Sequence, residues 1–217
     1  MNDYTLSDVT VETWVQGNID TLESLTGSVV LIEVFQVNCP GCFIYALPTA
    51  IQWHQHYQDQ GLAIIGLATA FEDYDQNTLT NLQRLIDTGE VFGETRKALT
   101  HQGVLTDGKL DWRLPFPVGM DRIVPDIQPV TQERVVDYAK QCLPSFHEYS
   151  MDQQQKIFQQ VRTYLKQKTM KAETFERFAL QGTPSSLLFD RKGHLQHVSF
   201  GDQLRHLPSV IEKYLRL

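Results

Sequence analysis

The chain has 217 residues, of which 41% are hydrophobic and 10% aromatic, enough to bury one sizeable core. Its 19 basic and 26 acidic residues give a net charge of −7 without any basic tract, which argues against binding to nucleic acid or to an anionic membrane. Apolar runs such as Val29 to Ile32 are far shorter than the roughly 20 residues of a membrane-spanning helix. We therefore expect a soluble protein whose partners include neither nucleic acid nor membrane.

The cysteines and the N-terminus bear on the cellular compartment. The first eight residues show no positive start and no apolar stretch ending at a cleavage site, so we predict a cytoplasmic protein. Of the three cysteines, Cys39 and Cys42 are three positions apart, and Cys142 follows a hundred positions later. This is not a disulfide framework for a domain of this size. The close pair therefore indicates either redox chemistry or a metal site.

The first half of the chain predicts alternating strands and helices. The predicted elements are a strand at 10–15, a short helix at 20–25, a strand at 29–35, a helix at 43–60 and a strand at 62–68. The segment 29–35 is β-branched and apolar on both faces except at Glu33, which is typical of a central strand. A strand, a helix and a second buried strand in this order form the unit of a parallel sheet.

The second half adds a polar helical region. We predict a helix capped by Asn77 or Thr78 that resumes through 98–99, a short strand at 116–120, helices at 131–142, 151–168 and 172–180, strands at 185–190 and 195–200, and a last helix at 207–215. From about 122 to 181 the composition shifts toward Gln, Lys and Glu. We interpret 122–181 as a helical insertion of about sixty residues within a single domain spanning 1–217.

The segment Cys39-Pro40-Gly41-Cys42 directly follows the predicted central strand and opens a helix. The unpaired N–H groups and the positive dipole end of a helix N-terminus stabilise a thiolate, so Cys39 is expected to be a nucleophile. Cys42 lies one turn further, close enough to form a disulfide with Cys39 and too buried to attack first. Pro40 suits the first helical turn because it lacks the N–H that would be unpaired there.

Two other interpretations of the cysteine pair remain. The pair could be half of a zinc site completed by His54 and His56, but two histidines two positions apart on a helix point to opposite sides. The cysteines could also be inert core residues. We favour the redox interpretation and expect no bound metal. Cys142 is expected to be a half-buried free thiol, with a resolving role as the minor alternative.

Two distant segments resemble the thioredoxin superfamily. Residues 28–48 resemble its active-site segment, and Gln181-Gly182-Thr183-Pro184-Ser185, with Leu187 to Gly193 after it, resembles its cis-proline loop and following hairpin. The Gly-Thr-Pro form and the extra N-terminal elements are more similar to the TlpA-like and redoxin branch, related to AhpC/TSA, than to short thioredoxin. The resemblance covers 10–121 and 182–217. It implies an α/β thioredoxin fold, a central mixed sheet flanked by helices, with an N-terminal extension and the helical insertion.

The resemblance also implies roles for single residues. Cys39 would be the attacking thiolate and Cys42 the resolving thiol. Pro184 would be the cis-proline that faces them, with an ordinary trans turn as the alternative. The backbone of Thr183 would pair with a substrate strand.

Glu33 stands six residues before Cys39, where thioredoxins hold a buried carboxylate that relays a proton to or from the resolving cysteine. A lone acid in an apolar strand is expected to have a raised pKa because burial disfavours its charged form. The alternative is a residue at the edge or end of the strand that reaches solvent. Pro40 and Gly41, between the two cysteines, are assigned to the substrate-binding surface.

The sequence departs from the family pattern at three positions. Pro48 matches the kink proline of the active-site helix but lies one residue further from Cys42 than the family has it. Asn38 stands where thioredoxins place a tryptophan. Gln36 stands where a peroxiredoxin needs a threonine, which argues against peroxidase activity.

Together these features predict a thiol-disulfide oxidoreductase without a cofactor. Its substrates would be protein or small-molecule disulfides. In the cytoplasm it would act as a net reductant, itself reduced by a thioredoxin reductase or the glutathione system. The alternative is a thioredoxin-fold binding module, either a soft-metal chaperone or a redox-sensing interaction protein, without turnover.

Overall fold

The computed structural model describes residues 4–143 and 145–217. The chain divides into two compact units, one made of the residues up to Arg122 together with Ala172–Leu217, the other of Ile123–Lys171. The second unit is therefore a single stretch of sequence between the two parts of the first. Residues 1–3, the start of the stretch on which the expectation of no export signal rests, lie outside the described residues.

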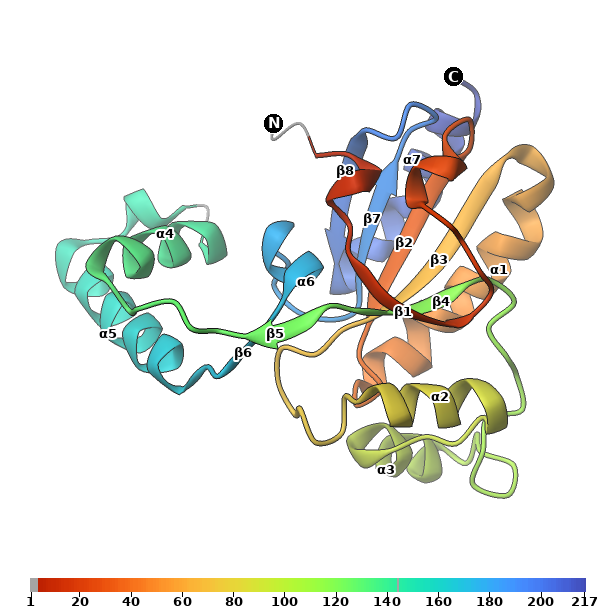
Figure 1. Ribbon diagram of the computed structural model, residues 1–217, viewed down its shortest axis with the longest axis horizontal. Helices are drawn as coiled ribbons and strands as arrows, with labels where there is room; N and C mark the ends of the chain where they lie inside the picture. The colour runs from red at the N-terminus through yellow and green to blue at the C-terminus, as the bar shows by residue number, and fades with distance from the viewer. Residues whose placement is uncertain (1–3, 144) are drawn as a thin grey trace. The chain divides into compact units, whose positions relative to one another are not determined.

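The first unit is built on a six-stranded sheet with the strand order β1-β4-β3-β2-β7-β8 (Figure 1). Its strands are β1 Val11–Gln16, β2 Val29–Phe35, β3 Leu62–Ala68, β4 Val118–Asp121, β7 Ser185–Phe189 and β8 Leu195–Phe200. The pairs β2–β3 and β3–β4 are parallel, whereas β1–β4, β2–β7 and β7–β8 are antiparallel. The sheet is therefore mixed, as predicted. Pro117, the proline of the predicted strand at 116–120, directly precedes the first residue of β4.

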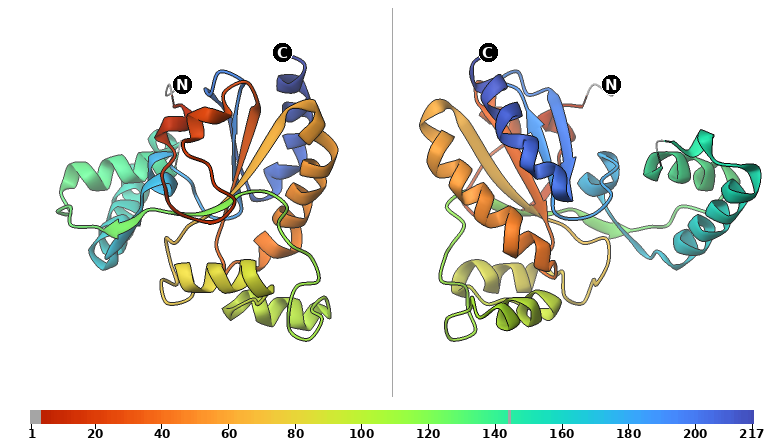
Figure 2. Two further views of the ribbon diagram at one scale, coloured as in Figure 1. Left: turned by 45° about the vertical axis from the view of Figure 1, so that its right-hand side comes forward. Right: turned by 180° about the vertical axis from the view of Figure 1, so that it is seen from behind.

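The helices of the first unit lie around this sheet, some of them beyond the end where β2 finishes (Figure 1). They are α1 Leu47–Tyr57, α2 Leu79–Thr88, α3 Gly93–Gln102, α6 Glu173–Arg177 and α7 Leu207–Leu215. Figure 2 shows α1 and α7 side by side on one face of the sheet. Among the helices of residues 4–143 and 145–217, none is both long enough and apolar enough to cross a membrane.

The central strand β2 sets the position of the cysteine pair. All seven of its residues are buried, because it has a neighbour on each edge and helices over its α1 face. Side chains alternate between the faces of a strand, so Glu33 and Phe35 point to the same side. The ring of Phe35 lies 6.3 Å from that of Phe43, edge to face, which identifies this side as the one that the active-site helix covers.

The helix after β2 absorbs one residue more than a regular α-helix would hold. It begins at Pro40, passes through a π-helical segment, Cys42–Ala46, and continues as α1 with Pro48 in its first turn. A π-helical turn is a one-residue insertion into an α-helix. It therefore accounts for the extra residue that the sequence shows between Cys42 and Pro48.

A buried carboxylate ties α6 to the first unit. Asp121 accepts hydrogen bonds from the N–H groups of Thr174 and Phe175, at 3.0 and 3.2 Å, and from the Thr69 hydroxyl at 3.0 Å. Burial raises the pKa of Asp121, and these bonds oppose the rise. The ring of Phe175 also stacks on that of Phe71 at 4.3 Å. Residues 172–181, which composition grouped with the insertion, accordingly lie in the first unit.

The second unit contains two helices, α4 Gln132–Cys142 and α5 Met151–Gln167, and strand β5 Ile123–Pro125, which pairs with β6 Met170–Ala172. The helices meet through the rings of Tyr138 and Tyr164, with centroids 5.5 Å apart. Side-chain hydroxyls of Thr131 and Ser150 cap the starts of α4 and α5. Both helices agree with the predicted segments to within a residue or two.

Candidate active site

The two close cysteines form a disulfide at the start of the active-site helix. Cys39 and Cys42 are bonded through sulfur, with their Cα atoms 5.4 Å apart. Cys39 keeps 8% of its surface exposed, whereas Cys42 keeps none. Of the two cysteines, Cys39 is therefore the one with surface open to another molecule.

Two backbone groups contact the Cys39 sulfur. The N–H of Cys42 donates a hydrogen bond to Cys39 Sγ at 3.2 Å, and such a bond stabilises negative charge on sulfur when the pair is reduced. The carbonyl oxygen of Thr183 lies 3.6 Å from the same sulfur. Cys39 is thus held between the start of the helix and the loop that contains Thr183.

That loop lies directly against the turn between the cysteines. The peptide bond between Thr183 and Pro184 is cis. A Cβ atom added at Gly41 would be 3.8 Å from Cδ of Pro184, so a larger side chain at position 41 would press on the proline ring. The structure therefore brings together four of the residues singled out in the sequence, Cys39, Gly41, Thr183 and Pro184, while Pro40 begins the helix.

Glu33 is fully buried in β2, and only one of its two carboxylate oxygens has a hydrogen-bond partner. The hydroxyl of Ser186 donates a hydrogen bond to its Oε2 at 2.6 Å, while Oε1 has no partner. Burial raises the pKa of Glu33 from 4.5 to about 8, and the Ser186 bond opposes that rise. The carboxyl group is therefore mostly protonated at neutral pH and ionises just above it. It faces the helix that begins at the cysteine pair.

Ser186 is a site residue that the sequence reasoning missed. It pairs with Glu33 across β2 and β7, and on the other edge of β2 Glu33 pairs with Gly66 of β3. A Cβ atom at Gly66 would contact Phe35, Phe116 and Val118 at 3.3–3.4 Å. The small residues on both sides leave the carboxylate room within the sheet. Only the strand pairing, which the sequence does not give directly, could have identified them.

A groove of about 600 Å³ opens beside the cysteine pair, between α1 and the segment that leads into α7. It shares Gly41 and Pro184 with the redox turn, and its apolar lining includes Tyr45, Trp53 and Leu204. Tyr45 is 67% exposed, which is unusual for a large aromatic side chain. Its position is readable in the sequence, because 45, 49 and 53 share one face of a helix.

Asn38, in the place of the family's tryptophan, is the centre of a hydrogen-bond network. Its N–H donates to Oδ1 of Asn77 at 2.8 Å, its Nδ2 donates to Oδ2 of Asp73 at 2.7 Å, and its Oδ1 accepts from the N–H of Glu94 at 2.6 Å. Gly93 has φ +50°, and a side chain there would collide with the Asn38 amide. The residue before Cys39 is therefore fixed by polar contacts to the loop before α2 and to the start of α3.

The histidines of the alternative zinc interpretation have different neighbours. The ring of His54 packs edge-on against Phe116 with centroids 5.8 Å apart, and that of His56 packs against Tyr57 at 4.5 Å. In the part of the chain that the structure describes, no three His, Cys, Asp or Glu side chains are grouped to hold a metal ion. Cys142 is a half-buried free cysteine, and burial raises the pKa of its thiol.

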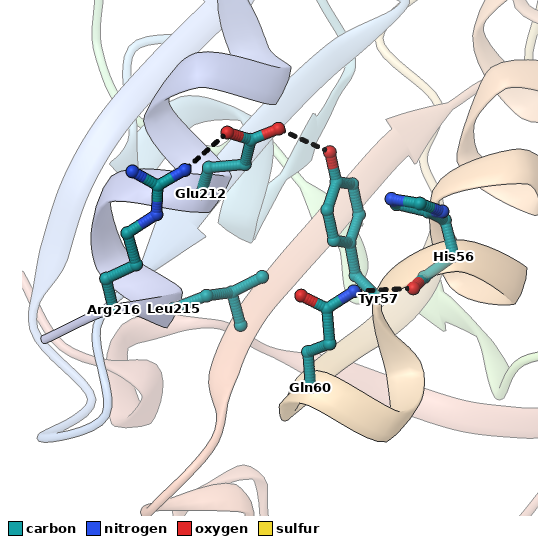
Figure 3. Close-up of a pocket in the computed structure, with 6 residues that line it drawn as sticks. All are labelled: His56, Tyr57, Gln60, Glu212, Leu215 and Arg216. Carbon is teal, nitrogen blue, oxygen red and sulfur yellow. Dashed lines mark hydrogen bonds and ion pairs between the residues drawn. The ribbon is translucent and has the colours of Figure 1, made fainter.

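A second cavity, of about 270 Å³, lies at the far end of α1, near the C-terminus of α7 (Figure 3). Glu212 stands at its centre and accepts hydrogen bonds from the Tyr57 hydroxyl and from Arg216, both at 3.1 Å. Burial and the Glu212 carboxylate raise the pKa of Tyr57. Because these side chains form hydrogen bonds with one another, we interpret them as a contact that joins the ends of the two helices.

Comparison with solved structures identifies the architecture. A thiol-disulfide isomerase from Corynebacterium glutamicum is similar over 100% of this chain and 98% of its own, with 24% identity and a TM-score of 0.59. A thioredoxin-like superfamily protein is similar over 97% and 96%, with 22% identity and a TM-score of 0.57. A putative thioredoxin from Neisseria meningitidis covers 99% of this chain and 92% of its own, with 16% identity and a TM-score of 0.50. The chain has the thioredoxin fold. The predicted fold class is therefore confirmed.

Sequence comparison reaches only part of this thioredoxin-fold chain. Protein DipZ of Mycobacterium tuberculosis and that of Mycobacterium bovis are each 44% identical over 59 residues, which are 26% of this chain and 8% of DipZ. The chain thus matches less than a tenth of the length of these curated relatives. No family model matches it.

Proposed function

We propose that the protein is a thiol-disulfide oxidoreductase of the TlpA-like, redoxin branch, which uses Cys39 and Cys42 to reduce disulfides. The single observation that carries the proposal is the unequal exposure of two bonded cysteines beside the Thr183–Pro184 loop. A redox pair needs one sulfur that substrate can reach and a second that reacts only within the protein. The names of the similar structures, a thiol-disulfide isomerase among them, support the same class.

The reaction begins with the reduced pair. The Cys39 thiolate attacks one sulfur of a substrate disulfide, the substrate S–S bond breaks, and the leaving sulfur departs as a thiolate that takes a proton from water. Cys39 is then joined to the substrate in a mixed disulfide. Cys42 loses its proton and attacks Cys39 Sγ, which releases the second substrate thiol and leaves the Cys39–Cys42 disulfide. The substrate gains two electrons and the pair loses two.

The ionised form of Glu33, which is the minor form at neutral pH, would take the proton that Cys42 releases. Its raised pKa, about 8, matches what a carboxylate needs in order to accept and return a proton near neutral pH. It lies on the side of β2 whose Phe35 contacts Phe43, the residue after Cys42. Oε1, the oxygen without a partner, is free to receive the proton.

Polypeptide disulfides are the substrates that the surroundings of Cys39 favour. The Thr183 backbone beside Cys39 Sγ is placed to pair with an extended segment. The adjoining groove, with Tyr45, Trp53 and Leu204 in its lining, suits apolar side chains that flank a cysteine. Because such side chains are exposed mainly in unfolded chains, we expect unfolded or flexible disulfide-bonded proteins to be preferred over compact ones.

The proposal extends to the direction of electron transfer in the cell and to the partners that reduce the cysteine pair. With the cytoplasmic address expected from the sequence, the pair would be kept reduced by a thioredoxin reductase or by glutathione. The measurement that decides the direction is the reduction potential of the pair. A value near −270 mV would indicate a reductant, and one near −120 mV an oxidant, by comparison with thioredoxin and DsbA.

The test is the reduction of insulin disulfides with glutathione as the terminal reductant. The wild-type protein should reduce insulin disulfides over many catalytic cycles. Cys39→Ser should be inactive, and Cys42→Ser should accumulate the mixed disulfide because nothing resolves it. Cys142→Ser is the matched control, since it removes the free cysteine and should leave the rate unchanged. Equal rates for wild type and Cys39→Ser would overturn the proposal.

A further inference from the structure

The side chain of Gln36 links two loops at the active site. It lies directly after β2 and is 1% exposed. Its Oε1 accepts a hydrogen bond from the Thr183 hydroxyl at 3.2 Å, and its Nε2 donates to the carbonyl oxygen of Glu72 at 3.3 Å. The amide thus joins the loop that contains the cis peptide bond to the loop that follows β3.

A buried amide is informative because it is costly unless it is bonded at both ends. An apolar side chain would fill this position without that requirement. The loop after β3 is itself held to the active-site segment, since Asn77 donates to the same Glu72 carbonyl at 3.0 Å and accepts from the Asn38 N–H. Gln36 therefore holds Thr183 to a segment that is already fixed beside Cys39.

Thr183 is the residue whose position matters for substrate. Its carbonyl oxygen is 3.6 Å from Cys39 Sγ, and its hydroxyl bonds to Gln36. If the hydroxyl were released, Thr183 could turn and its backbone groups would no longer be aligned with the sulfur. A substrate strand would then have to order the loop as it binds, which weakens binding.

We propose that Gln36 is a positioning residue, which fixes the Thr183 backbone beside Cys39 and so favours disulfides within a peptide over disulfides that have no peptide backbone. The inference rests on the proposed oxidoreductase function and deepens it. The selectivity would come from the hydrogen bond between Gln36 and Thr183, although the side chain of Gln36 contacts neither the substrate nor the cysteines.

The test compares two substrates in wild type and in Gln36→Met, which keeps the length of the side chain and removes both hydrogen bonds. For a disulfide-bonded peptide, we expect KM to rise about fivefold with little change in kcat, the loss expected for one hydrogen bond. For 5,5′-dithiobis(2-nitrobenzoic acid), which has no peptide backbone, kcat/KM should stay within about twofold. Thr183→Val removes the same bond from the other end and should reproduce this pattern.

On the peptide substrate the double variant should be no worse than Gln36→Met alone, because both substitutions remove the bond between Gln36 and Thr183. Thr95→Val is the matched control. It removes a buried bond of 2.9 Å to the Val37 carbonyl, on the same segment but away from Thr183, and should leave the ratio of the two substrates unchanged. Equal losses on both substrates, or none on either, would overturn the inference. If wild type turns over neither substrate, the proposed function itself is refuted.

Discussion

Replacing Glu33 by glutamine should make the stability of the protein less sensitive to pH. In the folded protein burial raises the pKa of Glu33 to about 8, whereas its usual value is 4.5. Between these two values the folded state holds a proton that the unfolded state has released. The free energy of unfolding of the wild type therefore decreases as pH rises through this window. Glutamine keeps the shape and the Ser186 contact but cannot ionise.

The size of the effect follows from the two pKa values. Each unit of pKa difference corresponds to about 1.4 kcal/mol. The window from 4.5 to about 8 thus gives an upper estimate of about 5 kcal/mol when the pH is well above 8, and about 3 kcal/mol at pH 7. Below about pH 4 the carboxyl is protonated in both states and the effect disappears.

Urea unfolding of the oxidised protein measures this directly. The quantity to plot is the free energy of unfolding of Glu33→Gln minus that of wild type, because the other titrating groups cancel in the difference. We expect the difference to rise steadily between pH 5 and pH 8 in favour of the variant. A difference that does not change with pH would show that Glu33 has an ordinary pKa, and the proton-acceptor role would fail with it.

Three further predictions concern neighbouring residues. Ser186→Ala should raise the pKa of Glu33 further, because it removes the bond that favours the carboxylate, and the same unfolding series would show the window extended to higher pH. Leu204→Asp should raise KM severalfold for peptides with an apolar residue beside the cysteine and not for small disulfides, measured by steady-state kinetics; equal loss on both would contradict the groove assignment. Gly93→Ala should destabilise the fold by about 1–3 kcal/mol in urea, because φ is positive and the Asn38 amide fills the space; an unchanged midpoint would refute this.

The central elements were predictable because their patterns are strong. The segments 29–35 and 62–68 are apolar, except at Glu33, and bounded by turn residues, and the structure has β2 and β3 with these same bounds. The sequence also predicts helices at α2, α4 and α5, and in the structure the hydroxyls of Thr78, Thr131 and Ser150 cap them. In each of these cases burial of one face determines the local conformation.

Other elements depend on tertiary contacts that the sequence does not display. The strands β5 and β6 have three residues each, too few for a period to be recognised. The helix expected to resume through 98–99 is a separate helix, α3, because Gly89 ends α2 in the left-handed conformation. Composition predicts that the insertion extends to residue 181, although α6 lies in the first unit. The hydrogen bond from Thr174 to Asp121 that holds α6 there joins positions more than fifty residues apart, so it cannot be recognised along the sequence.

The candidate site divides in the same way. Cys39, Cys42 and Glu33 could be singled out because spacing and apolar patterning are visible along the chain, and Pro184 followed from the family resemblance. Ser186 and Leu204 could not, since they reach the site only through strand pairing and helix packing. In the sequence, Gln36 is notable only because it stands where a peroxiredoxin needs a threonine. Its hydrogen bonds to two loops appear only in three dimensions.

The departures from the family pattern all lie between β2 and the first turns of α1, and each has a local structural consequence. The extra residue before Pro48 is taken up by the π-helical turn, Asn38 is bonded to the loop before α2 and to the start of α3, and Gln36 is bonded to Thr183. The residues around Cys39 are therefore held in place by hydrogen bonds from these two side chains. Because these bonds determine the groups around the sulfur, the reactivity of thioredoxin cannot be transferred to this pair. Changes at Asn38 should alter that reactivity, whereas changes at Gln36 should alter the binding of peptide substrates, and the sheet beneath both residues should stay the same.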